Sequence, residues 1–192
     1  MSKLHEFKLD PTSPLDGMSQ EYEGVRINEV TDKSLVSIAT PKGEDKNLKK
    51  AISKHYQCDL PVVGQSTVSS DGKAVFLGMQ RDQMFVFFDY ETSNPVETVI
   101  KNLGATGYYT DQSDSWVMLQ ISGVQSRKAL ARICMLDLHA DVFTEGSVAR
   151  TAMEHMGTII FHEGQDSFII FTARSSAKSL LHAVETSIKN IE

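Results

Sequence analysis

Long hydrophobic runs are missing from this sequence. The longest unbroken apolar stretch, from Met84 to Phe88, has five residues, whereas a membrane-spanning helix needs about 20. Residues 1–24 contain no apolar core segment and carry five acidic residues, which fits neither a secretory signal nor an acid-poor transit peptide. We therefore expect a protein that does not cross a membrane and that resides in the cytoplasm.

Cysteine and positive charge are also scarce. The two cysteines, Cys58 and Cys134, form no Cys-x-x-Cys pair, which argues against a disulfide framework or a zinc knuckle and predicts buried free thiols. Only 19 Lys and Arg residues stand against 25 Asp and Glu residues, so the net charge is −6. This charge has the wrong sign for a protein that gains affinity by neutralising phosphates. We therefore expect no nucleic-acid partner.

What the chain does contain is 41% hydrophobic positions, enough for a core of ordinary size. Residues 1–24 are rich in Pro, Ser, Asp, Glu and Gly and lack apolar periodicity, which predicts an extended or disordered arm. From residue 25 onward, short apolar runs alternate with turn residues. We therefore place a single domain at residues 25–192.

Apolar runs and helical spacing define the expected elements of this domain. The runs at residues 25–30 and 35–39 predict a first hairpin, and those at residues 74–79 and 84–90 predict a second, clearer one. Apolar residues at helical spacing predict helices at residues 45–56, 95–103, 124–133 and 176–188. Further strands are predicted at residues 116–121, 147–153, 158–161 and 168–171.

The second half of the chain repeats the order of the first. Leu35 aligns with Trp116, 81 positions later, and Phe85 aligns with Phe168, 83 positions later. Units of this length with mixed strands and helices are too long for a solenoid repeat and favour two halves around one core. We therefore predict an α+β fold of duplicated, β-rich halves, half one at about residues 25–104 and half two at about 105–192. Two unrelated runs of similar order are the alternative.

Motifs of common catalytic sites do not occur in this sequence. The segment from Gly104 to Gly107 follows a helix instead of joining a strand to a helix, so it does not predict a phosphate site. Asp137 and His139 are open to two interpretations, a proton-transfer pair or a structural pair within a loop, and no nucleophile accompanies them. Aromatic residues such as Tyr90 and Trp116 fit a flat cofactor pocket or, more commonly, plain core packing. We predict no catalytic, cofactor-binding or metal-binding residues in this chain.

The segment from Cys134 to Thr151 resembles a motif of the gamma subunit of heterotetrameric sarcosine oxidase. In that family a Cys-Pro-Leu-Asp-Leu-His segment is followed by Phe, by Gly and by a short strand ending in Ala-Gln-Thr, and a Leu-Gly pair opens an upstream hairpin. The residues of this chain that match the pattern, called the motif residues below, are Leu77, Gly78, Cys134, Leu136, Asp137, Leu138, His139, Phe143, Gly146, Ala149 and Thr151. The positions that depart from it are Met79, Met135, Ala140, Val148 and Arg150.

This resemblance implies a fold like the folate-binding domain of glycine-cleavage aminomethyltransferases. It also implies a complex of alpha, beta, gamma and delta chains that oxidises sarcosine with oxygen to glycine, hydrogen peroxide and formaldehyde, or methylenetetrahydrofolate when tetrahydrofolate is present. In that family FAD, FMN, NAD, zinc and the folate site are attributed to the other three chains. The resemblance therefore implies a non-catalytic subunit of an oxidoreductase that binds no cofactor alone and packs mainly on the alpha chain.

Three other functions are alternatives to this one. A free-standing aminomethyltransferase needs a further C-terminal barrel domain, and an iron–sulfur maturation factor needs a Lys-Gly-Cys-Tyr-x-Gly-Gln-Glu segment that this sequence lacks. A stand-alone folate-binding or small-molecule-binding module stays open as the alternative. The sequence also leaves open whether sarcosine or another N-methyl amine is the substrate, and whether the isolated chain self-associates through its partner surface.

Overall fold

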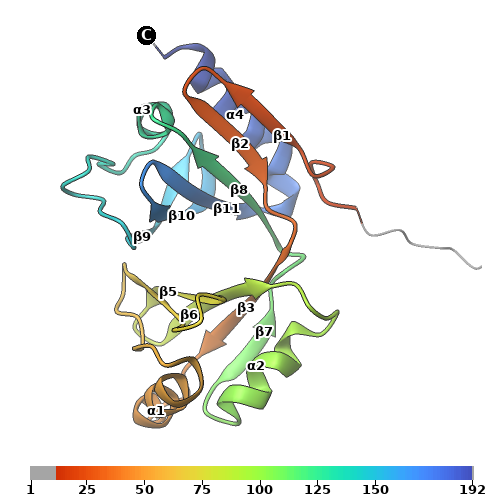
Figure 1. Cartoon of the computed structure of the whole chain (residues 1–192), viewed down its shortest axis with the longest axis vertical. Coiled ribbons are helices and arrows are strands. Elements are labelled where there is room, and N and C mark those ends of the chain that lie inside the picture. Colours follow the sequence, from red (N-terminus) through yellow and green to blue (C-terminus); the bar gives the residue numbers. More distant parts are fainter. Residues whose placement is uncertain (1–11, 192) are drawn as a thin grey trace, which may run out of the picture.

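The computed structural model describes residues 12–191, which form two antiparallel sheets and four α-helices, as expected for an α+β fold. Figure 1 shows four layers along the long axis of the molecule: two helices, the five-stranded sheet, the six-stranded sheet and two further helices. Residues 1–11 of the predicted arm lie outside the described residues. Within residues 12–191, every helix is too short or too polar to span a bilayer.

The six-stranded sheet has the strand order β1-β2-β8-β11-β10-β9. Its strands are β1 (Ser19–Tyr22), β2 (Val25–Glu29), β8 (Trp116–Ser122), β11 (Ser167–Ala173), β10 (Met156–Gly164) and β9 (Val148–Met153). Helices α3 (Ser126–Ala131) and α4 (Ala177–Lys189) cover its outer face, and the 3₁₀ turn Arg174–Ser176 precedes α4. Leu180 and Val184, four positions apart on one side of α4, pack with Ile160 and Phe168 of the sheet in one core cluster.

The five-stranded sheet has the strand order β4-β5-β6-β3-β7. Its strands are β4 (Ser66–Val68), β5 (Ala74–Gln80), β6 (Gln83–Asp89), β3 (Lys33–Ala39) and β7 (Tyr108–Asp111). Helices α1 (Asp45–Tyr56) and α2 (Pro95–Leu103) cover its outer face. Leu48 and Ile52 of α1 are fully buried because they lie one helical turn apart and face Phe76 of the sheet.

The inner faces of the two sheets pack on each other. Phe87 of β6 lies edge-on to both Phe161 and Phe171, with ring centroids 6.0 Å apart in each pair. The central strands β6 and β11 are therefore buried on both faces, which explains their continuous apolar runs. Because each large side chain contributes about 1.5–3 kcal/mol when buried, this shared core holds the two sheets together.

The predicted hairpin of residues 25–30 and 35–39 is wrong. Strand β2 pairs with β8 in the six-stranded sheet, whereas β3 pairs with β6 and β7 in the five-stranded sheet. The chain therefore crosses between the sheets after Glu29 and crosses back between β7 and β8. As a result, one strand of each predicted half lies in the sheet of the other half. Alternation of buried residues in β2 fixes which face points inward but not which strand becomes the partner.

The two sheets share one order of connections. The strands β4-β5-β6-β3-β7 of one sheet correspond in sequence to β9-β10-β11-β8-β2 of the other. In one set β3 is followed by α1, three strands and α2, and in the other β8 is followed by α3, three strands and α4. Strand β1, which comes from the predicted arm, adds the sixth strand at one edge.

Candidate functional site

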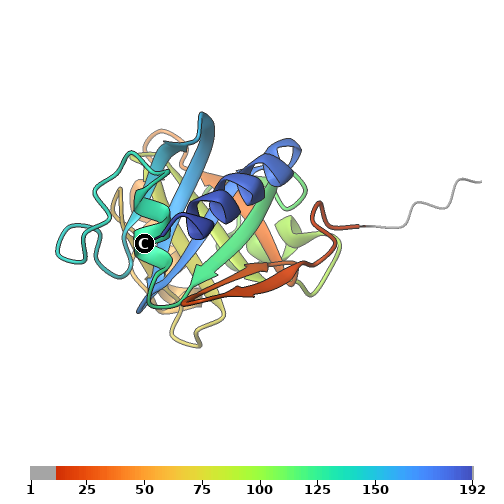
Figure 2. The same ribbon diagram turned by 90° about the horizontal axis from the view of Figure 1, so that it is seen from above.

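The motif segment forms the loop between α3 and β9, together with part of β9. Cys134 makes an isolated backbone bridge to Met153, and Leu138 and Phe143 are buried in the core of the six-stranded sheet. The remaining apolar motif residues of this segment, Leu136 and Ala149, pack against the same core, and Thr151 lies in β9. Figure 2, seen from above, shows this loop projecting at one side of the sheet that α4 crosses. An ordered loop of this length needs anchors other than a strand ladder.

Asp137 and His139 supply local anchors at the exposed surface of this loop. The Asp137 Oδ1 accepts a hydrogen bond from the backbone N–H of His139 at 2.9 Å. The His139 Nδ1 in turn accepts one from the backbone N–H of Asp141 at 3.3 Å. Both side chains therefore satisfy loop backbone, which is the structural alternative left open by the sequence.

Arg127 of α3 anchors the inner side of the loop. Its Nη1 donates to the carbonyl oxygen of Leu138 and, at 3.4 Å, to that of Phe143. Its Nη2 lies 3.3 Å from the Nε2 of His162, and its guanidinium carbon lies 5.0 Å from the centroid of Phe168. The His162 ring is stacked between Phe143 and Phe168, at 6.2 and 4.7 Å. The Arg127 cation and this stack of three rings therefore hold the loop against the sheet.

Arg127 and His162 are not among the residues that the sequence predicts. Arg127 precedes Lys128 on a short helix, which is the ordinary pattern of a solvated helix surface. His162 becomes informative only once the β10–β11 register places it opposite Phe168. No local signal identifies either residue, because the cluster joins a helix, a loop and a hairpin.

Leu77 and Gly78 form the upstream motif segment, and both lie in β5. The backbone of Gly78 exchanges hydrogen bonds with the loop before β4: its N–H donates to Gln65, and its carbonyl accepts from Gly64, both at 2.9 Å. That loop then bonds across to the other sheet, because Ser66 N–H donates to Gly146 O at 2.8 Å and Val148 N–H donates to Gly64 O at 2.9 Å. The two motif segments therefore meet in one backbone junction between the sheets.

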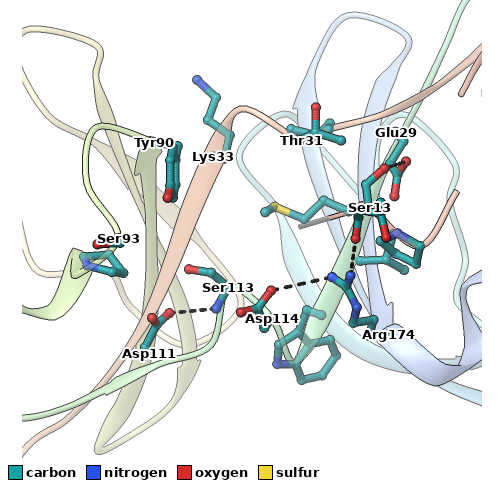
Figure 3. Close-up of a pocket in the computed structure, with 17 residues that line it drawn as sticks. Ser13, Glu29, Thr31, Lys33, Tyr90, Ser93, Asp111, Ser113, Asp114 and Arg174 are labelled. Carbon is teal, nitrogen blue, oxygen red and sulfur yellow. Dashed lines mark hydrogen bonds and ion pairs between the residues drawn. The ribbon is translucent and has the colours of Figure 1, made fainter. Parts of the chain in front are cut away.

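A cavity of about 450 Å³ lies between the two sheets, beside the crossover segments (Figure 3). Both sheets and the described part of the arm contribute to its lining. The charged and aromatic residues of the lining are Glu29, Lys33, Tyr90, Asp111, Asp114, Trp116 and Arg174. Within residues 12–191, this cavity is where charged groups from both sheets converge.

Glu29, at the end of β2, fixes the arm at one wall of this cavity. This residue is 8% exposed, and its carboxylate accepts hydrogen bonds from the Ser13 hydroxyl at 2.7 Å, the Leu15 N–H at 3.2 Å and the Gly17 N–H at 2.7 Å. A buried carboxylate needs such donors because leaving it without them is costly. Glu29 is therefore an anchor for residues 13–17.

Replacing Glu29 by glutamine should lower the free energy of unfolding by about 2 kcal/mol, because an amide nitrogen would face the N–H and O–H donors of the turn. Urea unfolding of the variant measures this loss. Glu21→Gln is the matched control, since Glu21 is exposed and its ion pair with Arg26 is long, at 3.8 Å. Equal unfolding midpoints for the two variants would show that the turn does not depend on the carboxylate.

A second hollow, of about 560 Å³, lies between α4, the end of α3 and the β9–β10 turn. Its lining includes Glu154 and His155, which adopt positive φ angles of 44° and 71° in that turn, and His182 of α4. Within residues 12–191, no group of three or more His, Cys, Asp or Glu side chains is arranged to hold a metal ion.

The cysteines and the aromatic runs have mainly packing surroundings. Burial raises the pKa of the Cys58 and Cys134 thiols above the ordinary value, so both stay protonated at neutral pH and are poor nucleophiles. Phe85 lies in the core between the sheets. Tyr90 and Trp116 line the cavity, whereas the run at residues 85–88 does not. Phe85 therefore follows the more common of the two interpretations, plain core packing.

Solved structures that share this fold include the following two. A structure of heterotetrameric sarcosine oxidase from Corynebacterium sp. U-96, in complex with pyrrole 2-carboxylate, matches with a TM-score of 0.74 and 21% identity over 86% of this chain and 84% of that chain. The glycine cleavage system aminomethyltransferase T from Bartonella henselae matches with a TM-score of 0.59 and 14% identity, over 81% of this chain and 44% of that one. At these low identities, the two structural matches show a common fold. No protein-family model matches the sequence, and neither does any curated protein sequence.

Proposed function

We propose that this chain is a non-catalytic, gamma-type subunit of a cytoplasmic heterotetrameric sarcosine oxidase and that it stabilises the complex by packing on the large alpha chain. The observation that carries the proposal is a likeness that is nearly complete in both directions, 86% of this chain and 84% of a chain from such an oxidase. By contrast, the match covers less than half of the aminomethyltransferase. The motif residues point to the same family.

In this proposal the chemistry belongs to the other chains. The alpha, beta and delta chains would hold FAD, FMN, NAD, zinc and the tetrahydrofolate site and would oxidise sarcosine. The surroundings of the motif residues support a structural role for this chain. Leu138 and Phe143 fill core positions, and Asp137 and His139 bond loop backbone, so each has a packing function that needs no substrate.

The partner surface we propose consists of loops. The outer sheet faces are covered by helices, and the inner faces pack on each other. Exposed apolar side chains occur on the loop before β4 and on the motif loop, which are joined by the backbone hydrogen bonds between the two sheets. They are Val62 and Val63 before β4, and Met135 and Val142 in the motif loop, each at least 58% exposed. These side chains are suited to burial against a partner.

We also propose that the two halves arose by duplication. Support comes from reciprocal hydrogen bonds: the acceptors Gly64 and Gly146, and the donors Ser66 and Val148, are both 82 positions apart. A further pair of equivalent bonds, one within each half, joins Tyr90 N–H to Asp32 O at 2.8 Å and Arg174 N–H to Ser115 O at 3.0 Å. Equivalent bonds at equivalent positions are expected for two copies of one unit around an approximate two-fold axis.

Co-expression with the neighbouring genes tests the proposed function. A tagged form of this chain should recover a yellow, flavin-bearing complex that oxidises sarcosine, because a permanent interface of about 2,000 Å² or more survives purification. Omitting this chain should leave the remaining subunits unstable or aggregated, since their contact surface would be exposed to water.

The isolated chain is the control for this experiment. It should be colourless and should not turn over sarcosine, with or without tetrahydrofolate. Turnover by the isolated chain, or recovery of an intact and equally active flavoprotein complex that lacks it, would contradict the proposed role.

A stand-alone folate-binding or small-molecule-binding module is the second candidate, and the cavity between the sheets favours it. Its volume of about 450 Å³ lies within the range of about 300–1,000 Å³ typical of small-molecule sites. Equilibrium dialysis of the isolated chain against tetrahydrofolate separates the two functions. Stoichiometric binding without partner chains would favour the module.

A further inference from the structure

The cavity between the two sheets has no role in the proposed function, yet its walls carry several polar and aromatic groups. Tyr90 and Asp111 lie on the side of the five-stranded sheet in Figure 3, and Arg174 and Glu29 lie on the side of the six-stranded sheet. Asp114, from the turn between β7 and β8, lies between them. Its lining therefore combines residues that are far apart in the sequence.

Both cations of the lining are already paired with acceptors of this chain. The Lys33 ammonium bonds to Asp89, and this hydrogen bond lowers the pKa of the Asp89 carboxyl. Arg174 donates from Nη2 to the carbonyl oxygen of Thr12 and lies 3.6 Å from Asp114 through Nη1. An anionic ligand would have to displace these acceptors.

The acidic groups differ in their remaining capacity for hydrogen bonds. Glu29 already accepts three hydrogen bonds and is buried. Asp111 accepts one, from the backbone N–H of Ser113 at 2.9 Å, and among the described residues the fully exposed Asp114 has only the long contact with Arg174. An ionised carboxylate has about four acceptor positions, so these two aspartates can accept further donors. With three acids and two bases, the lining has an excess of negative charge.

Two aromatic side chains complete the lining. Tyr90 is 57% exposed, and Trp116 is held in place by a hydrogen bond from its Nε1 to Gln112 at 3.2 Å and by edge contact with Phe85 at 5.9 Å. Electron-rich ring faces attract a positively charged group with an apolar body. Both rings share this lining with Asp111 and Asp114.

We propose that this cavity binds a small organic cation, an ammonium or guanidinium group attached to an apolar body, through Asp111, Asp114, Tyr90 and Trp116. This binding site goes beyond the proposed function and does not depend on it, because the residues involved belong to this chain alone.

Fluorescence provides a direct test because Trp116 is the single tryptophan of the chain and lines the cavity. Benzylammonium is the cationic probe, and benzyl alcohol and benzoate are probes of similar shape with neutral and negative charge. We expect a saturable change in Trp116 fluorescence with benzylammonium and weaker binding of the other two. The double variant Asp111→Asn with Asp114→Asn should bind benzylammonium about fivefold more weakly, because two exposed charge interactions are removed.

Asp82→Asn is the matched control, since Asp82 is an exposed aspartate on the β5–β6 turn outside the lining. It should bind benzylammonium as the natural chain does. Circular dichroism confirms that both variants are folded before they are titrated. The proposal is overturned if benzoate binds as tightly as benzylammonium, if the double variant keeps full affinity, or if no saturable change occurs.

Discussion

Replacing Gly78 by alanine is expected to lower the free energy of unfolding by about 3 kcal/mol or more. A Cβ atom at this position would lie 2.1 Å from the carbonyl oxygen of Val62 and 3.1 Å from that of Gln65. Both obstacles are backbone, so no side-chain rotation relieves the overlap. The loop before β4 must then move away from β5 and give up its hydrogen bonds to Gly78.

The effect should extend beyond β5 because the same loop bonds to Gly146 and Val148 of the other sheet. Urea unfolding measures the loss of stability, and amide exchange at Ser66 and Val148 reports whether the junction has opened. If Gly78→Ala unfolds like the natural chain with slow exchange at both amides, the close approach of the two segments is not what requires glycine.

Gly157→Ala is the matched control for this substitution. Gly157 lies in β10, which occupies the place of β5 in the other sheet, and a Cβ atom there would have no neighbour within 4 Å. Its φ is not in the left-handed region, so alanine is compatible with the backbone. We expect a change within about 1 kcal/mol for this variant.

Elements with a local signal could be predicted from the sequence. The helix at residues 45–56 is confirmed with the same bounds, because its apolar residues recur at helical spacing within a few turns. The hairpin of β5 and β6 is confirmed because two apolar runs are joined by a short polar turn. Helix α3 is shorter than predicted, ending at Ala131, since the following residues turn into the motif loop.

The exchange of strands between the sheets could not be predicted in this way. Strands β2 and β3 are separated by only three residues, which is typical of a hairpin. Strand β2 pairs with the adjacent β1 and with β8, and β3 pairs with β6 and β7. Of these partners, β6, β7 and β8 are tens of residues away. Pairing is decided by which apolar faces can be buried together, a property of the whole chain that local patterns do not contain.

The candidate site likewise has some residues that the sequence predicts and others that it does not. The motif resemblance identified Leu138 and Phe143 as important positions, but not the cation that holds their carbonyl groups. The cavity joins Arg174 to Thr12 across 162 positions of sequence. Such sites are assembled by the strand exchange itself, because the crossover segments that connect the sheets also form the cavity walls.

Replacing Arg127 by methionine is the second change expected to have a large effect. Methionine keeps the apolar stem but removes the donors to Leu138 and Phe143 and the cation above Phe168. The free energy of unfolding should fall by about 2–3 kcal/mol, because two carbonyl groups in a partly buried cluster lose their charged donor and Phe168 loses its cation. The loss should be concentrated in the motif loop, because the backbone ladder of β10 and β11 does not involve Arg127.

Hydrogen exchange distinguishes this local effect from general unfolding. The amides of Val142 and Phe143, which bond to His139 O at 3.0 and 2.9 Å, should exchange much faster in Arg127→Met, while those of β10 and β11 stay protected. Lys128→Met is the control, since Lys128 is exposed and takes part in no ion pair among residues 12–191. If the loop serves as the partner surface, Arg127→Met should also weaken recovery of the flavin-bearing complex, and Lys128→Met should not. Unchanged exchange at Val142 and Phe143 would show that the stacked rings alone hold the loop.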